Sequence, residues 1–473
     1  MKLKLWTYVG LAALVAGGPA RAGEDLLFAP PPEWVAQAAP AAESIPEPDL
    51  PVAILSLDTQ IRSEEGRQAV YNASKIKFLT AQGLAAGNLA FAWRPETDDL
   101  TIHRVLIHRD GKAIDVLGEG QTFSVLRREQ NLEQAMLDGT LTANLFPEGL
   151  QVGDVLEFAT TLSSHNPVTG SHAESVIGPL NFAAGRVDVT LSWPEGAAMQ
   201  LDRSGDLPEW KRSRRGGFEF AEVHLRDIQP ILLPRGAPER YAVARIGQAT
   251  DYGSWSEVSR LFVPLYAEAA AIPAEGPLRA EVEKIRAASE DPTVRVEKAL
   301  ALVQERVRYV ALLSGLGGLV PASAAETWSR RYGDCKGKTA LLMGILAELG
   351  IQSEPVLVST GLGDMLGGML PAVGLFDHVI LRAAVEGREY WLDGTRTGDS
   401  SLRDCTCLIS AGAFLSVKAL SWCGLFPRRS NNRPRTSPSN STLAKASMAK
   451  CPRSSKSSFA VIRPWPCTMA SHR

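Results

Sequence analysis

Between residues 52 and 240 the apolar positions recur at the short period of β-strands. Leu100 to Ile107 and Gly185 to Trp193 mix β-branched and polar residues in partial alternation, which is typical of strands with one buried face. Leu150 to Phe158 contains a turn that leads into a similar run, and Asp110-Gly111 is a strong signal for a hairpin turn. We therefore expect residues 52–240 to form an antiparallel β domain with a sandwich-like fold.

The apolar spacing becomes helical from residue 277 onward. Leu278, Val282 and Ile285 fall on one face of a first helix. Asp291-Pro292 combines a capping residue with a proline suited to the first turn, so a second helix is expected to begin there. The apolar stripe of this second helix comprises Val296, Leu300 and Val303.

A third helix is expected to begin at Cys335 and to end before Gly350. Its apolar face comprises Leu341, Leu342, Ile345, Leu346 and Leu349. Short apolar runs then predict strands at residues 355–359, 377–385 and 389–392. Helices followed by a small sheet indicate an α+β module over residues 277–402, with residues 241–276 as a connecting segment.

The first 22 residues have the pattern of a secretory signal peptide. Two lysines precede an apolar run from Leu5 to Val15. The small residues of Ala20-Arg21-Ala22 then have the pattern of a cleavage site. The run is shorter than the roughly 20 apolar residues that a membrane span needs. We expect cleavage after Ala22 and a periplasmic or otherwise exported protein, with an uncleaved anchor as the alternative. Residues 23–51 are rich in Pro and Ala and are expected to form an extended linker.

Charge and cysteine content change abruptly near residue 403. Residues 1–404 hold 39 basic and 52 acidic residues, whereas residues 405–473 hold 11 Lys or Arg and no Asp or Glu. Five of the six cysteines also lie in the second segment. We interpret residues 403–473 as an atypical basic tail rich in Cys, Ser and Pro, best explained by a frameshift near residue 402. A nucleic-acid- or membrane-binding tail is the alternative.

Cys335 is the one cysteine before this tail, so residues 1–404 offer it no disulfide partner. At a helix start its thiol would lie near unpaired N–H groups and the positive end of the helix dipole, which favour the reactive thiolate. Lys336 and Lys338 add positive charge, and Asp334 is expected to cap the helix. These features predict a nucleophile; a buried structural cysteine is the alternative.

His378 and Asp393 are the expected base and orienting carboxylate of this thiol. A two-residue turn at Glu386-Gly387 would place Asp393 opposite Ile380 on the neighbouring strand. His378 and Asp393 would then be diagonal neighbours on one face of the sheet, within reach of a hydrogen bond. A three-residue turn would move Asp393 to the other face, where it would be an ordinary turn residue. In chain order, Cys335, His378 and Asp393 give the outline of a thiol acyl-transfer site.

The remaining candidates for chemistry are weaker. The backbone N–H of Cys335 is a natural oxyanion donor, and Trp328 is a poor candidate for a second donor because hydrophobic packing is its more common role. Cys405-Thr406-Cys407 lacks the second close pair of ligands that a zinc site needs. Gly315-Leu316-Gly317-Gly318 lacks the context of a phosphate-binding loop. We expect neither a metal ion nor a cofactor.

Several motifs in this chain resemble exported bacterial proteins in which a DUF3857-type N-terminal domain precedes a transglutaminase-like domain. The motifs are Val307-Arg308-Tyr309-Val310, Arg330 to Lys336, Phe376 to Ile380, Tyr390 to Thr395, Arg109-Asp110-Gly111-Lys112 and Leu150 to Asp154. The resemblance covers about residues 55–400 and implies a papain-like core with a Cys-His-Asp triad at Cys335, His378 and Asp393. Gly337 departs from the family pattern, which has an acidic residue at this position.

We expect an exported transglutaminase-like acyl-transferase, or a cysteine peptidase or amidase, that acts on peptide amide bonds. Its partner would be a peptide or protein substrate, with cell-wall peptide as one candidate. We expect no nucleic-acid partner and no membrane span after signal cleavage, and the oligomeric state is left open. The alternatives are a non-catalytic binding or scaffold protein that uses the β domain, or an inactive truncated product.

Overall fold

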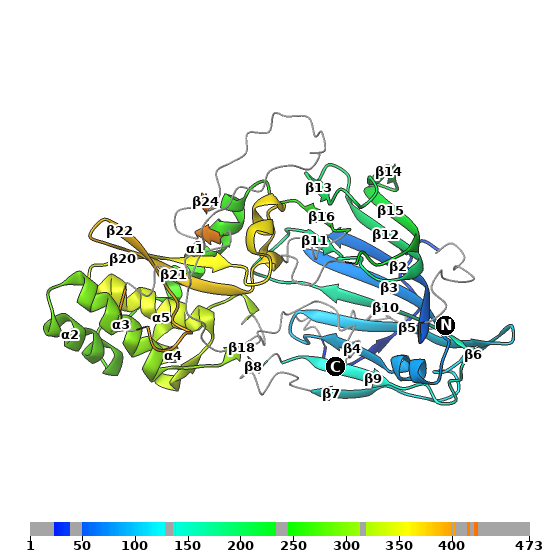
Figure 1. The fold of residues 1–473 in the computed structure, drawn as a ribbon, viewed down its shortest axis with the longest axis horizontal. Helices are drawn as coiled ribbons and strands as arrows, with labels where there is room; N and C mark the ends of the chain where they lie inside the picture. The colour runs from blue at the N-terminus through cyan, green and yellow to red at the C-terminus, as the bar shows by residue number, and fades with distance from the viewer. Residues whose placement is uncertain are drawn as a thin grey trace, which may run out of the picture.

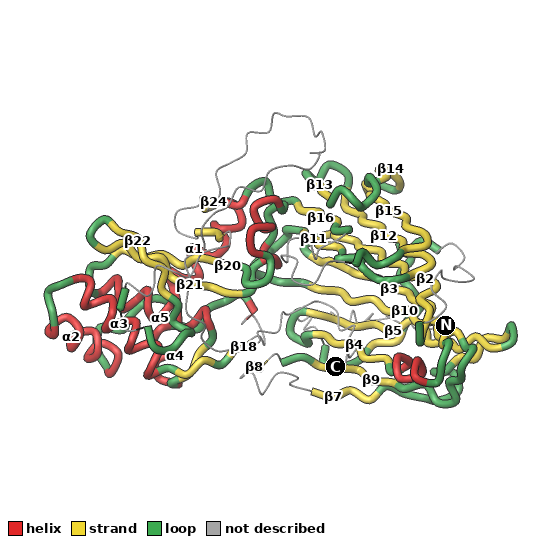
Figure 2. The backbone as a smooth tube through the Cα atoms, in the orientation of Figure 1, coloured by secondary structure: helices red, strands yellow, loops and turns green. Residues whose placement is uncertain are grey.

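The computed structural model describes residues 23–37, 50–127, 136–137, 139–232, 245–312, 318–399, 401–402, 414–416 and 421–423. The expected signal peptide and most of the tail after residue 402 lie outside these ranges. Within them, no helix has the length and apolarity required to cross a membrane. Strands fill one half of the molecule and most helices gather in the other (Figure 2).

The strand-rich half is built on a nine-stranded sheet (Figure 1). Eight of its strands follow the order β1-β5-β10-β3-β2-β12-β15-β14, and β6 pairs with β5. The strands are β1 Leu27–Phe28, β2 Val52–Glu64, β3 Arg67–Phe78, β5 Asp98–Arg109, β6 Lys112–Asp115, β10 Val155–Ser164, β12 Ala184–Pro194, β14 Lys211–Arg215 and β15 Phe218–Ile228. Asp110 and Gly111 form the predicted hairpin turn between β5 and β6, with left-handed φ angles of 50° and 74°.

The expectation of a purely antiparallel β domain is wrong, because the large sheet is mixed. β2 pairs with β12 in parallel, with Val187 opposite Leu57, and the short β1 pairs in parallel with β5. Alternation of apolar and polar residues specifies which face of a strand is buried. It carries no information on the direction of the neighbouring strand, so the sequence pattern could not distinguish the two arrangements.

Two three-stranded sheets pack against different parts of the large sheet. One contains β4 Leu89–Trp93, β7 Ser124–Arg127 and β9 Leu141–Leu145, and the other contains β11 Glu174–Ile177, β13 Gln200–Arg203 and β16 Gly247–Thr250. Trp93 and Leu156 belong to the buried cluster of the first. Trp193 and Ala249 belong to that of the second. The β domain therefore has two apolar cores instead of the single core of a simple sandwich.

The Pro- and Ala-rich segment expected to be a linker lies partly against the β domain. Besides the pairing of β1, the side chain of Gln60 accepts from the N–H of Ala36 and donates to its carbonyl, both at 2.8 Å. The indole of Trp93 donates to the carbonyl of Gly23 at 3.3 Å. An extended proline-rich conformation is also one that can lie along a sheet edge. Residues 38–49 of the expected linker lie outside the described residues.

The expected connecting segment, residues 241–276, contains regular structure. β16 is the central strand of its small sheet, and helix α1, Trp255–Ala269, follows it. Ser254 caps α1 by accepting from the N–H of Glu257 at 3.3 Å. The Ser254 to Glu257 spacing is a helix-start signal, whereas Pro264 inside the helix is unfavourable for a continuous helix.

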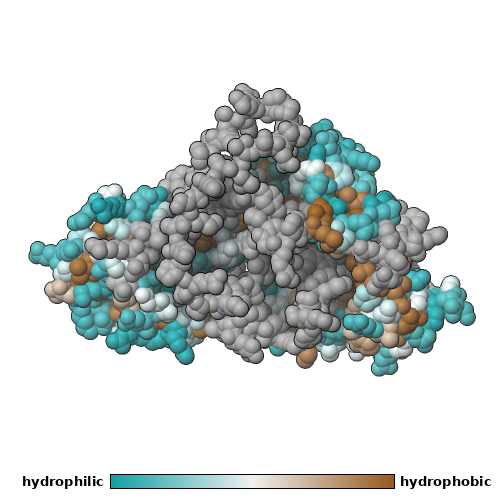
Figure 3. All heavy atoms as spheres, viewed as in Figure 1, coloured by the Kyte–Doolittle hydropathy of each residue, from teal (hydrophilic) through white to brown (hydrophobic). Residues whose placement is uncertain are grey.

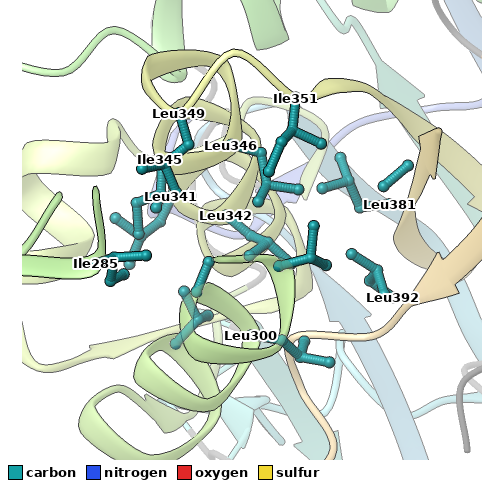
Figure 4. Packing of buried hydrophobic residues seen from close by; sticks show 14 of the residues in the cluster. Ile285, Leu300, Leu341, Leu342, Ile345, Leu346, Leu349, Ile351, Leu381 and Leu392 are labelled. Carbon is teal, nitrogen blue, oxygen red and sulfur yellow. The ribbon is translucent and has the colours of Figure 1, made fainter. Parts of the chain in front are cut away.

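The helical half contains α2 Pro277–Ala288, α3 Pro292–Arg306, α4 Ala324–Arg330 and α5 Cys335–Glu348. Asp291 caps α3 as predicted, accepting from the N–H of Thr293 at 2.8 Å. Leucine and isoleucine side chains of α5 meet Ile285 of α2 and Leu300 of α3 in one buried cluster (Figure 4). In the view of Figure 3, hydrophilic residues cover most of the outer surface around α2 and α3.

Helix α5 lies at the centre of this half and is buried along most of its length. Gly344 allows a close approach of α1, because a Cβ at this position would lie 2.2 Å from the carbonyl oxygen of Ala270. Gly350 follows the helix with a left-handed φ of 76°, as its sequence position predicted.

A five-stranded sheet of order β22-β21-β20-β23-β24 packs on α5. Its strands are β20 Gln352–Val358, β21 His378–Val385, β22 Arg388–Leu392, β23 Phe414–Ser416 and β24 Ser421–Cys423. The first three are close to the predicted strands. The last two fall within the segment expected to be an atypical tail, and β23 pairs with β20.

Short parallel strand pairs complete the helical half. β17 Arg308–Tyr309 pairs with β19 Tyr332–Gly333 directly before α5. β18 Ala311–Leu312 pairs with β8 Met136–Leu137, which belongs to the β-rich half. The two halves are therefore joined by backbone pairing as well as by chain connection.

Candidate thiol site

Cys335 is the first residue of α5. Asp334 caps the helix as expected, since its side chain accepts from the N–H of Gly337 at 2.8 Å. The thiol is buried, with 9% of the residue exposed. Among the described residues, no acceptor binds the backbone N–H of Cys335 or Lys336. The helix start therefore presents two free N–H donors beside the sulfur.

His378 begins β21, and Asp393 directly follows β22. Glu386 and Gly387 form the expected two-residue turn, with left-handed φ angles of 49° and 77°. Leu381 lies opposite Leu392. The same register places Asp393 opposite Ile380. His378 lies two residues from Ile380 on the same face, so it is the diagonal neighbour of Asp393. Nε2 of His378 lies 3.1 Å from Oδ2 of Asp393.

The second carboxylate oxygen of Asp393 is held by its own chain. Oδ1 accepts from the N–H and the hydroxyl of Thr395, at 2.9 and 2.7 Å. The amide of Gln304 on α3 donates to the carbonyl of Asp393 at 2.9 Å and to Asp399 at 2.8 Å. Asp393 to Thr395 has the pattern of a local turn stabilised by an aspartate side chain, which could have indicated Thr395. Gln304 comes from a distant helix and has no local signal.

His378 also contacts the thiol. Burial lowers its pKa, but hydrogen bonds to Asp393 and Cys335 and the charges of both partners raise the pKa of His378 to about 10. Burial raises the pKa of Asp393, and the hydrogen bond and charge of His378 bring it below its usual value. Because Asp393 occupies Nε2, the nitrogen left for the thiol is Nδ1. The imidazole therefore lies between a carboxylate and a sulfur, both of which favour its protonated form.

The two lysines expected to favour the thiolate have other partners. Lys336 forms an ion pair with Asp334. Lys338 is 1% exposed and donates to the carbonyl of Val307. Burial lowers the pKa of Lys338 to about 8, although the charge of Asp393 opposes this change. The cation that contacts the thiol is thus His378, while the two lysines direct their positive charge to other partners.

Trp328 and Gly337 both lie at packing contacts of the helical half. The ring of Trp328 lies in the cluster around α5, under the guanidinium of Arg331, and does not line the cleft at Cys335. A Cβ at Gly337 would lie 2.8 Å from the hydroxyl of Thr327, so the close contact of α4 with α5 explains the missing acidic side chain.

A cleft with a volume of about 590 Å³ opens above the thiol. Cys335, His378 and Tyr309 of the helical half line one part of it. Another part is lined by the β domain, including the turn after β2 and the residues that lead into β11. The cleft is within the size range of small-ligand sites and lies between the two halves. The described residues contain no group of three or more His, Cys, Asp or Glu placed to hold a metal ion.

Comparison with known proteins identifies part of the chain. A solved structure, that of a candidate protease from Parabacteroides distasonis ATCC 8503, is similar with a TM-score of 0.62 and 14% identity over 78% of this chain and 70% of that chain. This likeness concerns the fold. A mutant M1 zinc metallopeptidase from Deinococcus radiodurans bound to a Tyr-Ser-Ala substrate reaches a TM-score of 0.24 at 10% identity over 42% of each chain, too low to carry an argument. The comparison with curated proteins gives no match.

Residues 64–232 match a family described as a domain of unknown function with a solved structure, so this chain contains a DUF3857 domain.

Proposed function

We propose that this protein is a thiol acyl-transferase or cysteine peptidase that acts on peptide amide bonds through Cys335, His378 and Asp393. The observation that carries the proposal is the position of one buried imidazole, bonded to Asp393 at 3.1 Å and in contact with the Cys335 thiol. The helix start and the cleft above it support the same role. The transglutaminase-like motifs favour this chemistry over that of other thiol enzymes.

In the first half of the reaction, the Cys335 thiolate attacks the amide carbonyl carbon. A carbon–sulfur bond forms, and the free N–H groups of Cys335 and Lys336 stabilise the developing oxyanion. The carbon–nitrogen bond then breaks, and the protonated His378 gives its proton to the leaving amine. The product is a thioester on Cys335, with a neutral imidazole beside it.

In the second half, water or an amine attacks the thioester. The neutral His378 takes the proton of this nucleophile, the carbon–sulfur bond breaks, and the thiolate and the imidazolium are restored. Asp393 holds Nε2 throughout, so Nδ1 remains directed to the sulfur. Water as acceptor gives a peptidase or amidase, and an amine gives a transglutaminase.

The first test is the rate at which iodoacetamide modifies Cys335 at about pH 6, where an ordinary thiol with a pKa near 8.5 is mostly protonated. We expect His378→Ala to slow modification by about 100-fold, because the thiolate loses its cation. His108→Ala is the matched control, since His108 also contacts a carboxylate but lies away from the cleft. Equal rates in wild type and His378→Ala would refute the activated thiol.

The second test looks for the acyl-enzyme. Intact-protein mass spectrometry after exposure to a mixture of peptides and peptidoglycan fragments should reveal an adduct on Cys335. Cys335→Ala should show none. Absence of an adduct, together with equal capture of a partner by wild type and Cys335→Ala, would favour a binding protein instead.

A further inference from the structure

A glutamate of the β domain binds the segment that leads into His378. Glu174, the first residue of β11, accepts from the N–H of Val373 through Oε2 and from the N–H of Gly374 through Oε1, both at 2.6 Å. Val373–Leu375 is a 3₁₀ turn, η6, three residues before β21. In Figure 1 the yellow segment before β21 lies beside β11 and β16. One carboxylate thus binds two consecutive amides of the other half of the molecule.

Other contacts of the same surface support this arrangement. The side-chain oxygen of Gln248, on β16, accepts from the N–H of Leu370 at 2.9 Å. Tyr252, which follows β16, belongs to the buried cluster that contains Cys335 and Val379. The small sheet of β11, β13 and β16 therefore contacts both the segment before His378 and the core beneath the thiol.

The segment between Gly374, whose N–H binds Glu174, and His378 is short and hydrogen-bonded. The N–H of Phe376 donates to the carbonyl of Val373, and the N–H of Asp377 donates to that of Val358 on β20, both at 3.2 Å. The carboxylate of Asp377 accepts from the N–H and the hydroxyl of Thr360, at 2.8 and 2.6 Å. The backbone before His378 is thus fixed to β20 at one end and to the β domain at the other.

We propose that Glu174 is a positioning residue of the thiol site, through which the DUF3857 domain holds the segment before His378 and sets the contact between His378 and Cys335. This inference rests on the proposed function. It gives the β domain a role inside the site, in addition to lining the cleft.

The environment of Glu174 agrees with a specific role for a carboxylate. Burial raises its pKa, the two amide bonds oppose this rise, and among nearby groups Asp251 raises the pKa and His172 lowers it. Both neighbours belong to the β domain, where His172 contacts Asp251 at 2.9 Å. An amide in place of the carboxylate would direct its NH₂ group at a backbone N–H. The substitution Glu174→Gln therefore removes one bond and adds a repulsive contact at nearly constant volume.

The test compares Glu174→Gln with Glu222→Gln in the full chain. Glu222 lies on β15 of the same domain and contacts Arg215, so it controls for loss of a carboxylate elsewhere. The measured quantity is the iodoacetamide rate of Cys335 at about pH 6 divided by the rate at about pH 9, where an ordinary thiol is also ionised. We expect Glu174→Gln to lower this ratio about tenfold, because one bond between the carboxylate and the segment that positions His378 is lost. Glu222→Gln should leave the ratio unchanged.

A second variant, with a smaller expected effect, separates a positioning role from a general loss of stability. Gln248→Ala removes the single bond to Leu370, and we expect it to lower the ratio by about threefold. A thermal melt of each variant measures stability separately. A lower melting temperature with an unchanged ratio in Glu174→Gln would show that Glu174 is a structural contact and would overturn the inference. If His378→Ala also leaves the ratio unchanged, the proposed function itself fails.

Discussion

Two pairs of a histidine and a carboxylate, His108–Glu157 in the β domain and His378–Asp393 in the helical half, differ in what surrounds them. In the β domain, Glu157 contacts Nε2 of His108 at 2.8 Å, Nζ of Lys75 at 2.9 Å and Nε of Arg104 at 2.7 Å. In the helical half, Asp393 contacts one imidazole, and that imidazole also contacts a thiol. The first pair is part of a network with two further cations, and the second contacts the thiol that we propose as the nucleophile.

The comparison shows that a histidine–carboxylate pair is not by itself a functional signal. Burial raises the pKa of Glu157, but its bonds to Lys75, His108 and Arg104 lower it to about 2. The carboxylate of Glu157 therefore contacts three donors at once, and these contacts link strands β3, β5 and β10. The only histidine, lysine or arginine that contacts the Asp393 carboxylate among the described residues is His378, which also contacts the sulfur of Cys335 at the start of α5.

The sharpest test of this comparison removes the charge of each carboxylate. Asp393→Asn should lower the rate of amide turnover by about 100- to 10,000-fold, because the imidazole loses the partner that fixes its tautomer and its charge. Glu157→Gln should leave turnover within about twofold while lowering stability by about 1–2 kcal/mol, since three donors lose a charged acceptor. The measurement is the steady-state rate on a peptide found by the acyl-enzyme experiment. A loss of turnover in Glu157→Gln would break the comparison.

The pH dependence of stability should differ in sign between the two pairs. Glu157 has a folded-state pKa of about 2, below its usual 4.5, so its contribution is present above pH 4.5 and is lost as the pH falls toward 2. His378 has a folded-state pKa of about 10, above its usual 6.5, so its contribution is complete below pH 6.5 and is lost as the pH rises through 10.

Denaturant unfolding of wild type, Glu157→Gln and His378→Gln across this pH range measures both contributions. Glu157→Gln should flatten only the acid side of the stability profile, and His378→Gln only the alkaline side, each by on the order of 2 kcal/mol. An alkaline effect of Glu157→Gln would contradict the assignment.

The smallest expected effect concerns Trp328. Its indole nitrogen has no hydrogen-bond partner within the described part of the chain, and its ring packs in the cluster around α5. Trp328→Phe should therefore change turnover by no more than about twofold and stability by about 1 kcal/mol. A large loss of turnover at unchanged stability would mean that the indole N–H of Trp328 acts as an oxyanion donor in addition to the N–H groups of Cys335 and Lys336.

The local parts of the site were predictable from sequence. The cap at Asp334, the two-residue turn at Glu386-Gly387 and the strand register that places Asp393 beside His378 all depend on neighbouring residues. Cys335 was indicated by its position at a predicted helix start. In each case a short pattern determines the backbone, and the backbone determines where the side chain lies.

What escaped prediction depends on contacts between distant segments. Glu174 binds residues about 200 positions away, and Gln304 reaches Asp393 across 89. The parallel pairing of β2 with β12 and the burial of Lys338 are of the same kind. Lys338 was expected to add positive charge near the thiol, and only the packing of α5 shows that this side chain is enclosed.

The close approach of α5 to the end of α1 at Gly344 limits which amino-acid sequences can form this site. Any side chain at this position would collide with the carbonyl oxygen of Ala270, and moving α5 away from α1 would displace Cys335 at the start of the same helix. Substitutions at Gly344 should therefore be eliminated during evolution even though the residue lies far from the sulfur. A search for related chains gains a simple criterion: a glycine nine residues after the cysteine that begins the helix.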